Sequence, residues 1–445
     1  NFGDGLGLGV ASRGLAAGDS ILTVPEGLAL DVNSTPSCHP EQTPEADCRI
    51  ERAVHAAVAK GEASRLTGLL TLLVMERRRG HISGLPRSAA SSVLEVLPEL
   101  NWQAEHGLFA IDPDEFRVLG VGTSMERWRV AAESKTSEAH NFIQLAGSGA
   151  LGTEMGGEVS IEEVRWAYLM LHAYGQWTDD ESLDDGVELS SKVVFLWPLF
   201  LARPTPEWQH GVKVRYDPAR KVFDVVASRV MKAHEEVLFV DRRLSDASAL
   251  SFRGLWLSSR HRARLDLNVS AVTRDPLSQP ILQKFGCGAQ PLRLYVEARK
   301  GVDPLFLSCM RLLALANKPT KLRRAVEREE WTKGWPETLA IDRRSESAAA
   351  ELAIGALQQA LHCLAPASAQ IRQKYGSERL ASRPTVRVRE AETMVIVGLL
   401  KSMKELELLS HNEYLFDALR DAQRRPASAP SPKGSAKAGT RDSGG

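Results

Sequence analysis

The sequence has no excess of charge of either sign and no long apolar run. Lysine and arginine together number 56, as do aspartate and glutamate, in a chain of 445 residues. Because balanced charge produces no net field, neither nucleic acid nor a charged membrane surface is expected as a partner. No apolar run approaches the roughly 20 residues that a membrane-spanning helix needs. The sequence therefore predicts a protein without membrane segments, which we expect to be a monomer.

Cysteine is also scarce. The five residues, Cys38, Cys48, Cys287, Cys309 and Cys363, are irregularly spaced. Such a pattern is typical of a reduced, intracellular protein rather than of a disulfide framework, although it does not indicate a compartment. Cys38-His39 and Cys48 offer one sulfur pair and one imidazole within a loop. Since a structural zinc site needs four such ligands, we expect no metal here.

The remaining composition is that of a globular protein, with 43% hydrophobic and 25% charged residues, and the length predicts two or more folded units. Residue patterns predict strands at 21–24, 212–216, 222–227 and 237–240, with the second and third forming a hairpin. They predict helices at 66–80, 345–363 and 388–408, and one starting at a capping box of Ser160 and Glu163. Strands at both ends of 1–270 thus enclose a helical middle.

Three smaller patterns have ordinary interpretations. Arg77-Arg78-Arg79 is typical of a solvated helix end. Glu235-Glu236 cannot act as a carboxylate pair within a strand, because adjacent strand residues face opposite ways. The last stretch, 423–445, has no large apolar residue and is predicted to be a disordered tail.

Several stretches occur in an order that resembles one protein family. In chain order they include "GLGLGVASRGLAAGDSILTVP", "LTGLLTLLVMERRRG", "VRWAYLMLHAYGQW", "YDPARKVFDVVASRVMKAHEEVLFV" and "VRVREAETMVIVGLLKSM". Together they resemble the SET domain, in its Rubisco large-subunit methyltransferase branch, with His234 in place of a family glycine. The resemblance implies an α+β protein: a SET β fold over 1–275 with a helical insert at about 50–175, then an all-α substrate-binding domain over 285–422.

The same resemblance implies a function. It implies transfer of a methyl group from S-adenosylmethionine (SAM) to a lysine of a protein, which the C-terminal helical domain would bind. The SAM-contacting loop would be Gly5, Leu6, Gly7, Leu8 and Gly9, a segment that on its own also fits a glycine turn in a β corner. A phosphate-binding loop is disfavoured, because the segment precedes a strand and lacks Gly-Lys-Ser/Thr.

Several family motif positions carry other residues here. Family members place tyrosines at the end of the opening strand and before a Gly-Phe segment, an Asn-His pair after a Pro-Leu strand, and Ser-Arg after the Trp-Ala helix. The residues in these places are Asp241, Arg253 before Gly254-Leu255, Arg203-Pro204-Thr205, and Ala173-Tyr174. No tyrosine occurs between Tyr216 and Tyr295, and no Asn-His dipeptide occurs at all. The sequence therefore identifies no catalytic residue.

Two hypotheses follow. The first is a lysine methyltransferase with unusual pocket residues, in which another hydroxyl, from Ser245, Ser248 or Ser251, reaches the methyl position. The second is a non-catalytic relative that binds a protein partner through its C-terminal helices. Tyr174 fits both, since its ring can point into the cofactor pocket or simply pack. Arg253 favours the second, because a guanidinium beside a sulfonium is repelled in a dry site.

Overall fold

The computed structural model describes most residues of the chain. They are 14–25, 49–81, 94, 97–102, 106–146, 157–177, 193–194, 203–205, 212–217, 219–240, 244–254, 262–269, 278–284, 287, 292–297, 304–316, 318, 320, 322, 342–375 and 383–417. The chain divides into two compact units. The first comprises Asn1–Leu265, Tyr295–Arg299 and Ala360–Ile396, and the second Asp266–Leu294, Lys300–Gln359 and Val397–Gly445. The predicted tail, 423–445, lies outside the described residues.

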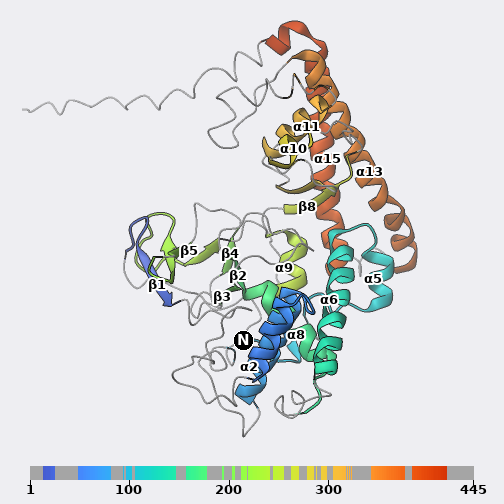
Figure 1. Cartoon of the computed structure of the whole chain (residues 1–445). Coiled ribbons are helices and arrows are strands. Elements are labelled where there is room, and N and C mark those ends of the chain that lie inside the picture. Colours follow the sequence, from blue (N-terminus) through green and yellow to red (C-terminus); the bar gives the residue numbers. More distant parts are fainter. Residues whose placement is uncertain are drawn as a thin grey trace, which may run out of the picture. The chain divides into compact units, whose positions relative to one another are not determined.

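The first unit contains a five-stranded mixed sheet. Its strands are β1 (Ser20–Pro25), β4 (Arg203–Thr205), β5 (Val212–Asp217), β6 (Val222–Ala227) and β7 (Leu238–Val240), in the order β1-β6-β5-β7-β4. Figure 1 labels β1, β5 and β4. The predicted hairpin is confirmed, because β5 and β6 pair antiparallel with Val214 opposite Val225. Alternate residues of β6 are buried, as in a sheet with one face on a core. Phe223, Val225 and Ala227 supply that face, which packs with Leu15 and Met231.

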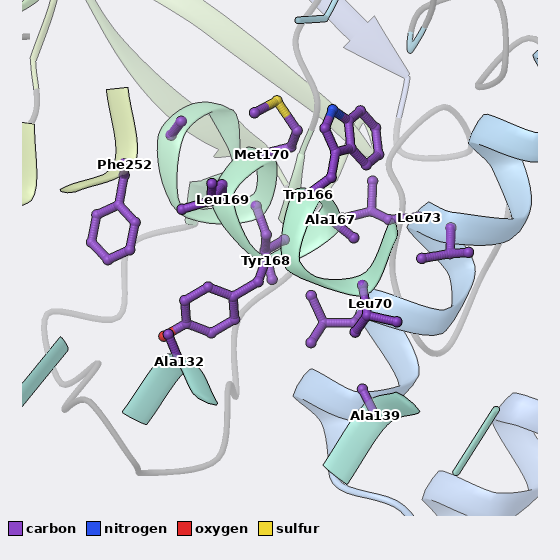
Figure 2. Packing of buried hydrophobic residues seen from close by; sticks show 14 of the residues in the cluster. Leu70, Leu73, Ala132, Ala139, Trp166, Ala167, Tyr168, Leu169, Met170 and Phe252 are labelled. Carbon is purple, nitrogen blue, oxygen red and sulfur yellow. The ribbon is translucent and has the colours of Figure 1, made fainter. Parts of the chain in front are cut away.

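Helices form the larger core of the first unit. They include α1 (Arg49–Ala59), α2 (Arg65–His81), α5 (Pro113–Leu119), α6 (Ser124–Ala146) and α8 (Ile161–Tyr174), of which α2, α6 and α8 contact one another. Figure 2 shows the packing: Leu70 and Leu73 of α2 and Ala132 and Ala139 of α6 surround Trp166, Ala167 and Tyr168 of α8. Trp166 is fully enclosed, and its indole N–H donates to the carbonyl of Pro98 at 2.7 Å, so its polar atom is satisfied.

The predicted capping box of α8 is present. The backbone N–H of Glu163 donates to the Ser160 hydroxyl at 3.3 Å, and the N–H of Ser160 donates to the Glu163 carboxylate at 2.9 Å. Arg78 of α2 makes two further hydrogen bonds of 2.7 Å to this carboxylate. It also donates to the carbonyls of Gly157 and Glu158. These charge-assisted bonds keep the pKa of Glu163 low despite burial, and they fix where α8 begins.

The prediction of a solvated helix end at Arg77-Arg78-Arg79 is wrong. Arg78 and Arg79 are buried, and Arg77 lies over the Trp166 ring with 4.8 Å between its guanidinium carbon and the ring centroid. Two of their acidic partners, Glu51 of α1 and Glu163 of α8, are remote in sequence. The run of three arginines therefore does not show by itself that these helices converge on it.

The second unit is mainly helical. It contains α10 (Gln279–Lys284), α11 (Pro304–Leu315) and residues of the long helices α13 (Arg343–Tyr375) and α15 (Pro384–His411), which contain the two predicted C-terminal helices. A buried ion pair joins Arg311 of α11 to Glu346 of α13 at 2.7 Å. Two further strands, β8 (Arg262–Leu267) and β9 (Leu292–Glu297), form a separate two-stranded sheet. Another two-stranded sheet, of β2 (Gln176–Trp177) and β3 (Val193–Val194), belongs to the first unit. No described helix meets the length and hydropathy that a bilayer crossing requires.

The expectation that the cysteines are reduced is wrong for one pair. Cys287 and Cys309 form a disulfide, and both are buried. They are 22 positions apart, and only the fold of α10 and α11 brings their Cα atoms within 5.3 Å. Cys363 is free and exposed, whereas Cys38-His39 and Cys48 lie outside the described residues. Among the residues that are described, no three His, Cys, Asp or Glu side chains gather as metal ligands would.

His234 occupies a backbone conformation that suits glycine. Its φ is 63°, in the left-handed region, at the position where the resemblance placed a family glycine. Such a conformation costs an L-residue about 1–2 kcal/mol. Glycine avoids this cost, but its larger entropy in the unfolded chain offsets part of the gain. We therefore expect His234→Gly to raise the free energy of unfolding by about 0.5–1 kcal/mol, measured by urea denaturation. Ala233→Gly, in the same turn but without a positive φ, is the control and should lower it. A loss of stability from both changes would contradict strain at His234.

Candidate functional site

The candidate site lies where helices α8 and α9 (Asp246–Arg253) end. The two helices pack together, and an aromatic cluster holds them in place. Phe252 of α9 stacks on His172 of α8, with 4.7 Å between ring centroids, and meets Trp128 of α6 edge-on at 4.9 Å. Tyr168 tilts against His172 at 4.4 Å. Figure 2 shows Phe252 and Tyr168 on this side of α8. The cluster fixes the direction of the last turn of α9, which carries Arg253.

Tyr174 is the last residue of α8. Only 4% of it is exposed, and it belongs to the main hydrophobic cluster of the first unit. Burial raises the pKa of its phenol to about 12, while the positive charge of Arg253 acts in the opposite direction. The hydroxyl therefore remains protonated at neutral pH. The sequence left open whether the ring points into a cofactor pocket or packs in the core. In the structure the ring packs in the core, and the charge of Arg253 lowers the pKa of its phenol.

Arg253 lies in the last turn of α9, where the helix dipole favours a cation. Gly254 follows it in the left-handed conformation, with φ of 62°, and its N–H donates to the carbonyl of Leu250 at 3.2 Å. A side chain at Gly254 would be strained there, and its Cβ would lie 3.3 Å from the Cβ of His106. The Arg-Gly pair is therefore a helix end that needs glycine at its second position.

The three candidate hydroxyls have different surroundings. Ser245 and Ser248 form a capping box at the start of α9: the Ser245 hydroxyl accepts from the N–H of Ser248 at 3.1 Å, and the Ser248 hydroxyl accepts from the N–H of Ser245 at 2.8 Å. Both therefore serve the helix start. Ser251 is fully buried, and within the described part of the chain its hydroxyl has no hydrogen-bond partner. Of the three, Ser251 is the one whose hydroxyl remains for another role.

The other predicted site residues are only partly placed. Gly5, Leu6, Gly7, Leu8, Gly9 and Asp241 lie outside the described residues. Pro204 lies in β4, which runs parallel to β7, so Thr205 stands opposite Val240 at the point where both strands end. The segment in place of the Asn-His pair therefore ends beside the strand that leads to Asp241. Glu235 binds Arg229 and accepts from the N–H of Lys232.

The donor set at the two helix ends suits a carboxylate. A guanidinium offers parallel N–H groups that match the two oxygens of a carboxylate, and a protonated phenol adds an O–H donor without adding negative charge. SAM carries a carboxylate on its amino-acid end, whose charge is complementary to that of Arg253, whereas Tyr174 is buried in the core. The sequence pointed to both residues through their positions in family motifs. Their proximity follows from the packing of α8 on α9, which no spacing between residues 174 and 253 predicts.

Comparison with solved structures shows which fold the chain adopts. The chain is similar to a crystal structure of the SET domain of LSMT bound to lysine and AdoHcy, with 18% identity and a TM-score of 0.54 over 93% of this chain and 88% of that one. It is also similar to a structure of Rubisco LSMT bound to AdoMet, with 17% identity and a TM-score of 0.52 over the same shares. No protein-family model and no curated protein matches the sequence. The chain therefore has the α+β SET fold followed by helices, as predicted.

Proposed function

We propose that this protein transfers a methyl group from SAM to a lysine side chain of a protein. The observation that carries the proposal is the fold: 93% of the chain matches the SET domain of LSMT, a protein whose solved structures hold lysine, AdoHcy and AdoMet. The similarity extends through the C-terminal helices rather than stopping at the sheet. In this proposal the SET region covers 1–275, and the helices of 285–422 bind the protein substrate.

The chemistry divides between the bound group and the chain. When bound, SAM supplies a methyl carbon whose bond to sulfur breaks as the lone pair of the lysine nitrogen forms the new C–N bond. The chain must accept that lysine as a neutral amine, which an apolar environment favours by lowering its pKa. Tyr174 supports this, because its protonated phenol adds no anion that would hold the ammonium form.

A second candidate function is a non-catalytic scaffold that binds a protein partner through the same helices. Two observations favour it. No tyrosine occurs between Tyr216 and Tyr295, and two of the three replacement hydroxyls, Ser245 and Ser248, cap α9. Loss of one preorganised contact typically costs about a hundredfold to a thousandfold in rate. A scaffold would therefore keep the fold and the helices while losing the chemistry.

Calorimetric titration of SAM and of S-adenosylhomocysteine into the full chain tests the proposal. We expect both ligands to bind with micromolar affinity, about −8 kcal/mol, and the chain to transfer a labelled methyl group to protein lysines. No heat and no thermal stabilisation at millimolar ligand would overturn the proposal. Binding of SAM without any transfer of label would favour the scaffold.

A further inference from the structure

The end of α15 exposes apolar side chains in the second unit. Ten large apolar side chains are exposed in the part of the chain that the structure describes, and four of them lie within residues 397–415: Val397, Leu408, Tyr414 and Leu415. Leu408 is 71% exposed and Tyr414 is 83% exposed. Single exposed apolar residues are ordinary on a protein surface, whereas such a concentration is typical of an interaction site.

Over this stretch α15 is apolar on two faces. Leu399 and Met403 are buried, so the helix already has the inward apolar face that a surface helix needs. Val397 and Leu408 are exposed on another side. At about 100° per residue, these two positions lie within about 20° of each other around the helix axis. The core of the second unit therefore does not account for them.

Two lysines share this outward face. By the same helical spacing, Lys401 and Lys404 lie within about 40° of Val397 and alternate with the apolar positions along the axis. Both are exposed, and neither has an ion pair or hydrogen bond to any described residue. The exposed carboxylate of Glu405 lies further round, at about 80°. We call Val397, Lys401, Lys404 and Leu408 the outer stripe.

The backbone beside the outer stripe is held in place. Arg343 of α13 donates to the carbonyl of Ser410 at 3.1 Å, near the end of α15. In the next turn the N–H of Leu415 donates to the side-chain oxygen of Asn412 at 3.1 Å. Tyr414 is thus displayed on a turn with a capped start, which lowers the ordering cost of binding. Tyrosine is also among the residues enriched at the centres of protein interfaces.

The chain itself offers no suitable cover for the outer stripe. Residues 423–445 contain no large apolar side chain, and they carry five lysines and arginines against one aspartate, so the lysines of the stripe would repel them. A second copy is disfavoured for the same reason. Antiparallel pairing of two stripes places Lys401 opposite Lys404, and parallel pairing places each lysine opposite itself.

We propose that the outer stripe, together with Tyr414 and Leu415, is a docking surface for a segment of another protein that carries aliphatic side chains and carboxylates. The aliphatic side chains cover Val397 and Leu408, and the carboxylates pair with the two lysines. A membrane surface is disfavoured, because equal numbers of acidic and basic residues give the chain no net positive field. The inference rests on that part of the proposed function in which the C-terminal helices bind a protein, and it applies to the methyltransferase and to the scaffold alike.

Synthetic helical peptides test the chemistry of the partner. The first peptide has leucines along one face, flanked by glutamates. The second has lysines in place of the glutamates, and the third has serines in place of the leucines. Fluorescence anisotropy measures binding of each peptide to the full chain without SAM. We expect the glutamate peptide to bind at least about tenfold more tightly than either of the other two.

Variants of the chain assign the binding to the outer stripe. Leu408→Ser and Tyr414→Ser should each weaken binding of the glutamate peptide by about tenfold. Lys401→Glu combined with Lys404→Glu should reverse the preference, so that the lysine peptide binds more tightly. All these positions are exposed, so the fold should be retained. Val130→Ser, at a position of α6 in the first unit that is 63% exposed, is the control and should leave every affinity unchanged.

Other outcomes would contradict the docking surface. Equal affinity for the glutamate and lysine peptides, or unchanged affinity in Leu408→Ser, would overturn it. A dimer in sedimentation that Leu408→Ser dissociates would assign the stripe to a second copy. Displacement of the glutamate peptide by a peptide of residues 423–445 would assign the stripe to the chain's own end, and binding to phosphatidylserine vesicles alone would assign it to a membrane. Calorimetry with SAM is independent of these results: if SAM fails to bind, methyl transfer is overturned and the docking surface stands.

Discussion

Arg79→Leu is expected to lower the free energy of unfolding by about 3–5 kcal/mol, because it leaves buried carboxylates without their cation. One nitrogen of Arg79 donates to Glu51 of α1 at 2.6 Å and to Glu76 of α2 at 2.8 Å. Both glutamate side chains are fully buried, and Arg79 is 8% exposed. Urea denaturation of the variant measures the loss.

The loss should depend on pH in a defined direction. Burial is the largest influence on Glu51 and raises its pKa, although Arg79 opposes it. Without Arg79 this pKa rises further above the unfolded value. A group with a raised folded pKa contributes stability that is present below its unfolded pKa and is lost as pH increases. The deficit of Arg79→Leu should therefore be smaller at about pH 5 than at about pH 8.

Two comparisons identify the cause. Adding Glu51→Gln and Glu76→Gln to Arg79→Leu removes both charges with little change in shape, and should recover part of the lost stability. Arg117→Leu is the matched surface control, because Arg117 and its partner Asp114 are 78% and 82% exposed. Exposed pairs contribute about 0–1 kcal/mol, so this change should have little effect. A similar loss from both arginine substitutions would show that unpaired buried charge is not the reason.

Local patterns in the sequence predicted local structure well. The hairpin of β5 and β6, the capping box of Ser160 and Glu163, and the long C-terminal helices all follow from residues within a few positions of one another. Alternation and capping are near-neighbour effects that a single sequence displays. The resemblance to a family extended the prediction to the SET fold, since the resemblance rests on the order of several such segments.

Contacts between remote segments could not be predicted from the sequence in the same way. Arg78 and Glu163 are 85 positions apart, and nothing near Arg78 distinguishes a buried arginine from a solvated one. Cys287 and Cys309 are 22 positions apart, and the pairing depends on how α10 and α11 fold. At the candidate site, the sequence named Tyr174 and Arg253 separately. Their common location required the packing of α8 on α9.

The serine hydroxyls show a further limit. A serine before a helix and a serine within it look alike in sequence, yet Ser245 and Ser248 cap α9 while Ser251 is buried without a described partner. The difference depends on helix register, which sequence patterns place only to within a few residues. The sequence therefore offered three equivalent candidates, whereas in the structure two of them cap a helix and the third is buried.

Glu392→Gln is expected to remove a pH dependence of stability worth about 3 kcal/mol. Glu392 of α15 is buried and receives the N–H of Ser124, at the start of α6, at 3.1 Å, and the two groups also share a hydrogen bond through the Ser124 hydroxyl. Burial raises the pKa of Glu392 to about 7, although the bonds from Ser124 and the charges of Arg127 and Arg389 oppose this.

The direction of this pH dependence follows from the raised pKa of Glu392. In the unfolded chain the Glu392 pKa is 4.5, so between that value and about 7 the folded state binds the proton that the unfolded state has released. Stability from this group is fully present below 4.5 and is lost as pH rises through about 7. The unsubstituted protein should therefore lose about 1.4 kcal/mol per pH unit across this window relative to Glu392→Gln.

Denaturant unfolding at a series of pH values measures this difference. As the pH rises from 4.5 to about 7, the Gln variant should lose less stability than the unsubstituted protein, because its amide does not titrate. The amide can still accept from the Ser124 N–H and donate to the hydroxyl. Glu390→Gln, two positions earlier on an exposed face of α15, makes the same change of charge and is the control. Parallel pH curves for the Glu392→Gln variant and the unsubstituted protein would mean that Glu392 stays ionised in the folded state. The helix dipole of α6 and Arg389 would then outweigh burial at this helix start.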